Sequence, residues 1–195
     1  RLCDSLCAVN PDVVFVASAL NDHLRAEQNW YASSDLSFVE YGALQLLDER
    51  FGGCRELSGF NVALFRALGI PCGIDRVVQN PHRIGSHMWT FMVDTDGRKL
   101  PYLWNYYNID REERMEEKYG KVYRDYFSVQ TTNWAVSYPD EDIPGILKNP
   151  FLRDVSDEYF GRNVAVVPLY DSAGDGRLCY LAVFNNAGWS PVAVG

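Results

Sequence analysis

One stretch decides the fold of this chain: it begins Gly52-Gly53-Cys54 and ends Ala63-Leu64-Phe65-Arg66-Ala67-Leu68-Gly69-Ile70-Pro71. Apolar residues recur every three to four positions between Cys54 and Leu68, which predicts a helix with one buried face. The glycine pair interrupts any earlier helix, and Gly69 followed by Pro71 is typical of a helix end. The pattern therefore places Cys54 at the first residue of a helix.

A cysteine in that position is suited to act as a nucleophile. The helix N-terminus carries partial positive charge, which favours the thiolate over the thiol. Its free N–H groups can bind an oxyanion, and Gly52 and Gly53 leave room for a substrate. The alternative is that Cys54 is a small, inert residue at a helix start, as free cysteines often are.

A thiol nucleophile needs a base, and the chain has three histidines: His23, His82 and His87. His87 opens a predicted strand, 87–93, in which alternation places His87 and Trp89 on one face. His87 is therefore the favoured base, with Trp89 shielding it from water. His82 lies in a predicted loop and stays the alternative base.

Hairpin geometry suggests the residue that orients this histidine. If Thr95-Asp96-Gly97 is a three-residue loop with Gly97 left-handed, Asp94 pairs with Arg98. Counting back along both strands then places Asn105 opposite His87. A loop one residue longer or shorter would bring Trp104 or Tyr106 there instead. Asp75, on the strand after the helix, is a further polar candidate.

The same residues resemble a known family. Gly53-Cys54, the Arg66-Ala67-Leu68-Gly69-Ile70-Pro71 phrase and His87-Met88-Trp89 are similar to motifs of the transglutaminase-like (papain-like) superfamily, of the type found in bacterial multidomain proteins. The resemblance covers about residues 50–105. It implies that Cys54 is the nucleophile and His87 the base. The family usually has Asp on the strand after the histidine; the matching stretch here, 100–105, contains Asn105 and no Asp.

The fold class that we expect is α+β: a papain-like core of helices packed on an antiparallel sheet, with a C-terminal β extension. We expect the core and its N-terminal helices to occupy 1–150. The β extension is expected over 151–195, as the start of, or the linker to, a further β domain. The pattern predicts helices at 12–32, 36–50 and 111–127, strands at 74–78 and 98–104, an irregular segment at 133–153, a hairpin of strands 164–170 and 179–184, and a possible strand at 191–194.

Composition excludes some classes of function. The chain has 195 residues, a formal net charge of −8 and 47% hydrophobic residues, so it can bury a core but lacks the basic face of a nucleic-acid-binding protein. No apolar run is long enough to span a membrane. Cys3 and Cys7 have helical spacing, but a metal site would need two more ligands and only His23 is near in sequence; we expect no metal.

The resemblance implies cysteine-dependent acyl transfer on an amide or peptide bond, with hydrolysis favoured over crosslinking and no cofactor. Substrates would be peptides, proteins or glycan-linked amides, and Trp30, Trp89 and Trp104 are candidates to line the cleft. The alternative is an inactive transglutaminase-like module with a binding or structural role. The chain starts without Met, so we expect a piece of a longer protein, and the resemblance favours the periplasm or cell surface. Oligomeric state has no signal in the sequence.

Overall fold

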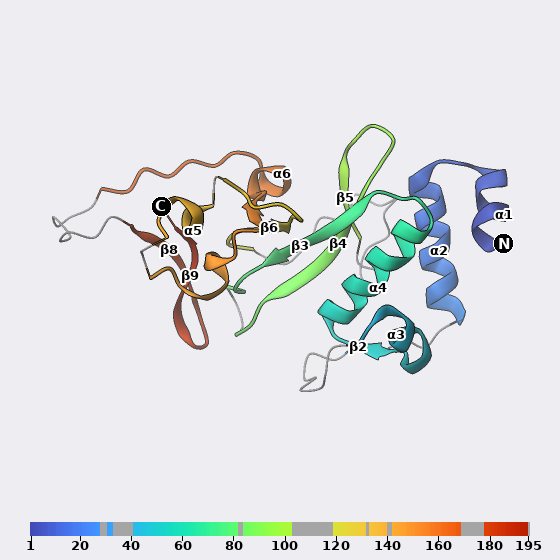
Figure 1. Ribbon diagram of the computed structural model, residues 1–195, viewed down its shortest axis with the longest axis horizontal. Helices are drawn as coiled ribbons and strands as arrows, with labels where there is room; N and C mark the ends of the chain where they lie inside the picture. The colour runs from blue at the N-terminus through green and yellow to red at the C-terminus, as the bar shows by residue number, and fades with distance from the viewer. Residues whose placement is uncertain are drawn as a thin grey trace. The chain divides into compact units, whose positions relative to one another are not determined.

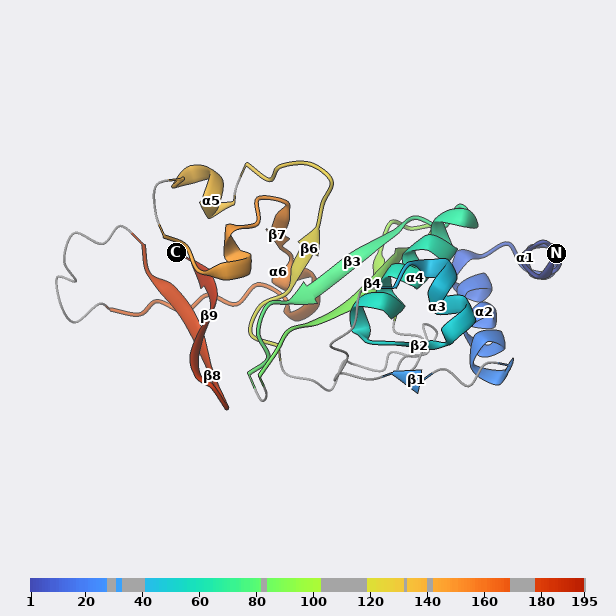
Figure 2. The same cartoon turned by 60° about the horizontal axis from the view of Figure 1, so that its bottom comes forward.

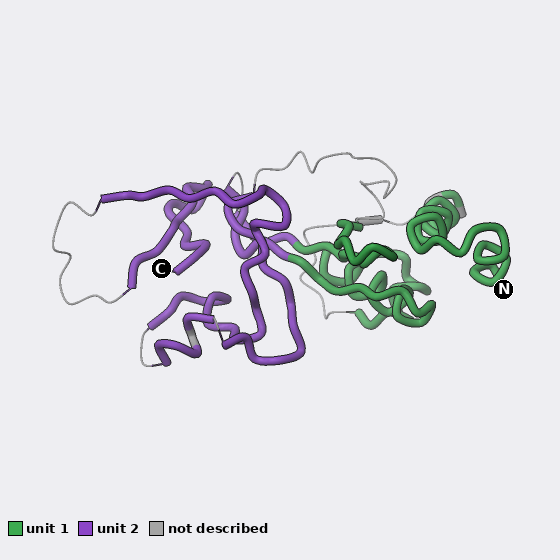
Figure 3. Tube along the Cα trace, turned by 90° about the horizontal axis from the view of Figure 1, so that it is seen from above, with its two compact units in different colours: residues 1–75, 88–116 green, residues 76–87, 117–195 purple. Residues whose placement is uncertain are grey.

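The structure is a computed structural model that describes residues 1–27, 31–32, 41–81, 84–102, 119–131, 133–139, 142–168 and 178–194. The chain divides into two compact units, shown in Figure 3. The first unit comprises residues 1–75 and 88–116, and the second comprises residues 76–87 and 117–195. The domain boundary predicted at residue 150 stays a prediction.

The described part of the first unit contains four helices, all of which precede the strands of the main sheet in the sequence. They are α1 (Leu2–Val9), α2 (Val13–Glu27), α3 (Ala43–Glu49) and α4 (Cys54–Ala67), as Figure 1 shows. The predicted helix 54–68 is confirmed, and Gly69 has the left-handed φ of 77° that suits a residue after a helix end.

The two helices predicted before α4, at 12–32 and 36–50, are shorter than expected. The first ends at Glu27, and Tyr31–Ala32 instead form a strand, β1. This strand pairs in parallel with β2 (Phe51–Gly52), as Figure 2 shows. The second begins only at Ala43, because Gly42 adopts an extended conformation at its N-cap. Residues 36–40 lie outside the described part of the chain.

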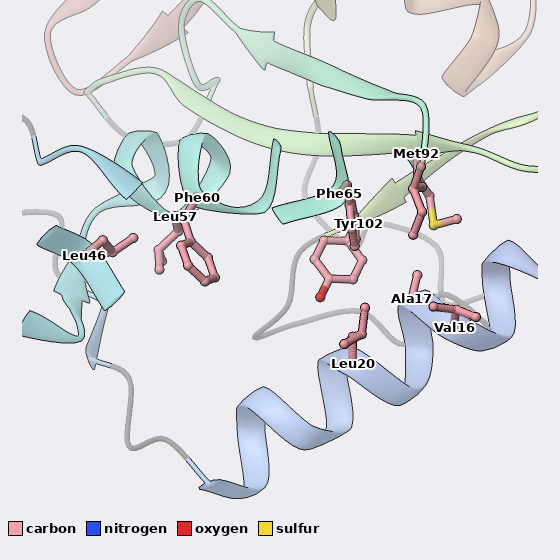
Figure 4. Packing of buried hydrophobic residues seen from close by; sticks show 10 residues of the cluster. Val16, Ala17, Leu20, Leu46, Leu57, Phe60, Phe65, Met92 and Tyr102 are labelled. Carbon is pink, nitrogen blue, oxygen red and sulfur yellow. The ribbon is translucent and has the colours of Figure 1, made fainter. Parts of the chain in front are cut away.

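The core of the first unit lies between α2, α4 and the sheet. In Figure 4, Leu20 and Ala17 of α2 point toward Phe65 of α4 and toward Tyr102. The rings of Phe65 and Tyr102 meet edge to face with centroids 4.7 Å apart, a geometry that aromatic pairs favour. The apolar stripe of the α4 sequence is therefore the buried face, as its spacing predicts.

The strands of the main sheet have the order β5-β4-β3-β6-β7, in which β6 is Tyr123–Asp125 and β7 is Leu152–Asp154. The sequence predicts β3 (Cys72–Val77), β4 (His87–Val93) and β5 (Lys99–Tyr102) within two residues at each end. The antiparallel β4–β5 register runs from Val93↔Lys99 to Thr90↔Tyr102. Helices on an antiparallel sheet confirm the α+β fold class.

The turn between β4 and β5 has the predicted geometry. Gly97 has φ 81°, and the Asp94 N–H donates to the Arg98 carbonyl oxygen at 2.9 Å. Asp94 and Arg98 therefore close a three-residue loop over Thr95-Asp96-Gly97. This confirms the loop length on which the position of Asn105 depends.

The second unit is built from short elements around a small apolar core. They are β6 (Tyr123–Asp125), α5 (Trp134–Ser137), a 3₁₀ turn (Gly145–Lys148), β7 (Leu152–Asp154), α6 (Ser156–Phe160), β8 (Tyr180–Asn185) and β9 (Gly188–Val194). β6 pairs with β7 and β8 pairs with β9, both antiparallel. Their core includes Ile143, Leu152 and Val192.

Three predictions for this part of the chain are wrong. The helix predicted at 111–127 does not include Tyr123–Asp125, which are β6 and pair with residues 152–154; residues 111–118 lie outside the described part. The irregular segment 133–153 contains α5, the 3₁₀ turn and the start of β7. Residues 164–168 are exposed and form no strand, because β8 takes β9 as its partner.

Across the described ranges, no helix combines the length and apolar character that a membrane crossing requires.

Candidate active site

Cys54 is the first residue of α4, as the sequence predicts. Gly53 is the N-cap, with an extended backbone, and the Leu57 N–H donates to its carbonyl oxygen at 3.0 Å. The Cys54 thiol is free and its residue is partly exposed. A reagent or substrate can therefore approach a sulfur that sits at the positive end of a helix.

The segment that leads into α4, residues 50–53, is closely packed. Arg50 ends α3 in the left-handed conformation, with φ 57° and ψ 32°. A Cβ at Gly52 would lie 2.8 Å from both Glu56 Cβ and Leu46 Cδ1, closer than real Cβ atoms approach. Gly52 is therefore required by packing, and not only by backbone freedom.

Glu56 caps the start of α4. It is the third residue of the helix, and its Oε2 accepts a hydrogen bond from the Gly53 N–H at 2.9 Å. This is the carboxylate half of a capping box. The sequence reasoning missed Glu56, although Glu three residues after a helix N-cap is a signal that would have found it.

Two hydrogen bonds join α4 to β4. The Ser58 hydroxyl donates to the Met88 carbonyl oxygen at 3.4 Å, and the Thr90 hydroxyl donates to the Ser58 carbonyl oxygen at 3.2 Å. Ser58 and Thr90 are buried. Ser58 follows Cys54 by four residues, so the two share one face of the helix. No pattern in the sequence pointed to this contact.

The chain that follows α4 also contacts β4. The Val93 N–H donates to the Pro71 carbonyl oxygen at 2.8 Å. Contacts at Ser58 with Met88, and at Pro71 with Val93, show that α4 runs in the same direction as β4. Figure 4 shows Phe60 and Phe65 following one another along the helix toward the end at which Met92 lies.

The structure describes some of the predicted site residues and not others. His87 is the first residue of β4 and is partly exposed, and Trp89 is 1% exposed. Trp30, Trp104 and Asn105 lie outside the described residues, as does His82, the alternative base.

Asp75 is fully buried in β3. Gly73, two residues earlier, lies against the Phe91 ring, which a Cβ at that position would meet at 2.7 Å. Alternation along both strands then places Asp75 on the sheet face of Phe91 and Trp89.

The described residues contain no group of three or more His, Cys, Asp or Glu side chains that could hold a metal ion. The Cys3 and Cys7 sulfurs are 4.0 Å apart on one face of α1. The pKa of the Cys3 thiol is raised, first by partial burial and then by the hydrogen bond with Cys7. This pair alone has too few ligands for the tetrahedral site of a structural zinc.

Comparison with known proteins gives one family. The model of the transglutaminase-like superfamily matches residues 3–104. No curated protein is matched.

Two solved structures share part of the fold. One is a proposed cysteine protease from Cytophaga hutchinsonii, 21% identical with a TM-score of 0.39 over 47% of this chain and 31% of that one. The other is the periplasmic domain of TgpA from Pseudomonas aeruginosa bound to ethylmercury, 20% identical with a TM-score of 0.43 over 54% of this chain and 42% of that one. The chain thus spans less than half the length of either structure.

Proposed function

This chain belongs to the transglutaminase-like superfamily, and from that premise we propose that it transfers acyl groups through a thioester on Cys54, with His87 as the base. The thiolate attacks the carbonyl carbon of an amide, and the C–N bond breaks as the protonated His87 gives its proton to the leaving amine. His87 then takes a proton from water, which attacks the thioester. The products are a carboxylic acid and the regenerated thiol.

The observation that carries this proposal is the pair of hydrogen bonds at Ser58. Because Ser58 bonds with Met88 and Thr90, it lies level with the residue between them, Trp89. Four residues of helix rise about 6 Å, and two residues of strand span about 6.6 Å. Since α4 and β4 run in the same direction, we expect Cys54 to lie level with His87.

Strand alternation alone does not bring the imidazole to the thiol, so we propose that the approach depends on the position of His87 at the end of its strand. Thr90 bonds with α4, so Met88, Thr90 and Met92 face the helix, and His87 has the parity of the opposite face. His87 is the first residue of its strand. We therefore place its imidazole around the start of β4, where the first turn of α4 presents Cys54.

Asn105 is the proposed partner that orients His87. The β4–β5 register ends, among the described residues, at Thr90↔Tyr102. If this register continued for three more residue pairs, it would bring Asn105 opposite His87. An Asn side-chain oxygen accepts a hydrogen bond from one imidazole nitrogen and leaves the other for the thiol.

The substrate that we propose is a peptide, protein or glycan-linked amide, with water as the acyl acceptor. Trp89, Trp104 and Trp30 are the proposed cleft residues, and Trp89, which is 1% exposed, would support the cleft from behind without lining its surface. The location that we propose is outside the cytoplasm, in the periplasm or at the cell surface. This chemistry requires no organic cofactor.

The proposal is tested by the rate at which iodoacetamide alkylates Cys54 at neutral pH, read by mass spectrometry. The exposed Cys179 is the internal reference thiol. Cys54 should react faster than Cys179, and His87→Ala should remove the difference. His23→Ala, a histidine change in α2, is the matched control and should leave the rate unchanged. The proposal would be refuted if Cys54 reacted no faster than Cys179 and if His87→Ala did not change its rate.

The second candidate is an inactive module with a binding or structural role. The observation that favours it is the absence of Asp from 100–105, because Asn supplies no charge to the imidazolium. If this candidate is right, iodoacetamide should alkylate Cys54 no faster than Cys179, and His87→Ala should not change the rate. The same alkylation experiment therefore separates the two functions.

A further inference from the structure

Glu56, which caps α4, is an acidic side chain. It lies at the same end of the helix as Cys54, the proposed nucleophile. Building on the proposed function, we propose that Glu56 is a positioning residue for Cys54 that also makes its reactivity depend on protonated His87. It would do so by fixing the Gly53–Cys54 peptide and by opposing the thiolate with its own negative charge.

The positioning role rests on the contacts of Glu56. Its Oε2 accepts from the Gly53 N–H at 2.9 Å, so the peptide unit before the cysteine has one orientation. Its Cβ lies against Gly52, whose other side is closed by Leu46. Leu46 is completely buried. The carboxylate and the Cβ of Glu56 therefore both contact the segment that enters the helix.

The electrostatic role follows from where the carboxylate sits. The N-terminus of a helix carries roughly half an elementary positive charge, which stabilises an anion in the first turn. In α4 the Glu56 carboxylate already occupies that position. A Cys54 thiolate would be a second anion at the same helix end, so the carboxylate opposes its formation.

Because of this opposition, the helix end alone would not produce the thiolate. A positive charge beside the sulfur is required, and protonation of His87 by the thiol proton provides it. The thiolate then forms chiefly as an ion pair with the imidazolium. Glu56 would thereby limit reaction of Cys54 with adventitious electrophiles when His87 is out of position.

Glu56→Gln separates charge from hydrogen bonding, because the amide oxygen can still accept from the Gly53 N–H. We expect alkylation of Cys54 to rise roughly two- to five-fold, the size of one charge interaction at a helix end. His87→Ala should slow alkylation less in the Glu56→Gln background than in the wild type. Glu49→Gln, which removes one exposed carboxylate from α3, is the matched control and should change neither rate.

Glu56→Ala tests the positioning role. It removes both the charge and the cap, so thermal stability should fall while that of Glu56→Gln stays close to wild type. Equal alkylation rates in the wild type and Glu56→Gln, together with a response of the wild type to His87→Ala, would overturn this inference and leave the proposed function standing. If His87→Ala does not change the alkylation rate of Cys54 in the otherwise wild-type protein, the proposed function itself is overturned.

Discussion

The Ser58 hydroxyl donates to the Met88 carbonyl oxygen at 3.4 Å, which joins the first turns of the cysteine helix to the residue after His87. Both partners are buried. The proposed nucleophile precedes one partner of this contact by four residues, and the proposed base precedes the other by one residue.

Ser58→Ala should loosen this connection. The substitution leaves the buried Met88 carbonyl without its hydroxyl donor, at a cost of about 1–2 kcal/mol of unfolding free energy. Urea denaturation measures that loss, and Ser5→Ala in the exposed part of α1 is the control. Cys54 alkylation should also become less sensitive to His87→Ala. Unchanged stability and unchanged sensitivity would contradict the role given to this bond.

Gly52→Ala should be strongly destabilising. Its Cβ would lie 2.8 Å from Glu56 Cβ and Leu46 Cδ1, and overpacking of this kind costs about 1–3 kcal/mol. Gly59→Ala, in the helix that follows, is the matched control, because nothing lies within 4 Å of a Cβ at Gly59. It should instead stabilise the protein by up to about 1 kcal/mol. Chemical denaturation of both variants distinguishes tight packing at Gly52 from a general preference for glycine.

Acid should weaken the β4–β5 turn. Burial raises the pKa of the Asp94 carboxyl, but hydrogen bonds from the Arg98 N–H and guanidinium outweigh burial, so the net pKa is below its usual value. A lowered folded-state pKa contributes stability above the unfolded-state pKa of about 3.9, and that stability is lost as pH falls through the folded-state value.

Urea denaturation between pH 3 and pH 6 checks this expectation. Asp94→Asn should reduce the loss of stability on acidification below about pH 4. Asp96→Asn, in the same turn but with an exposed side chain, should reduce it less. An identical pH profile for the wild type and Asp94→Asn would contradict the expectation.

Tyr102→Phe should destabilise the core next to the sheet. The Tyr102 hydroxyl donates to Asn21 Oδ1 at 3.3 Å, and both side chains are fully buried. Removal of the hydroxyl leaves the amide oxygen unpaired and costs about 1–3 kcal/mol. The double variant Tyr102→Phe, Asn21→Leu should recover part of the loss, because no buried polar atom then remains. Additive losses in the two single variants would contradict a direct interaction.

The sequence predicts the part of the fold that depends on local signals. Helix α4 has an apolar stripe, a glycine pair before it and Gly69 after it, and the β4–β5 hairpin has a loop whose glycine requires a positive φ. These features depend on neighbouring residues, so the position of Cys54 and the hairpin register could be read from the sequence.

The remainder depends on pairing between distant residues. Tyr123–Asp125 are a strand because residues 152–154 lie beside them, and apolar spacing in 111–127 fits a helix equally well. Asn185 is followed by a tight turn to Gly188, so β8 pairs forward with β9 instead of backward with 164–168. At the site, the Ser58 bonds connect residues 30 and 32 positions apart, beyond the reach of periodicity.

The short parallel pairing of β1 with β2 has an evolutionary consequence. Tyr31–Ala32 and Phe51–Gly52 close a chain loop directly before the cysteine helix. The entropy of closing a flexible loop grows only with the logarithm of its length, by about 0.6 kcal/mol for each doubling. A change in the number of residues between the two strands should therefore cost little folding free energy, and relatives of this protein can differ in that length without moving Cys54.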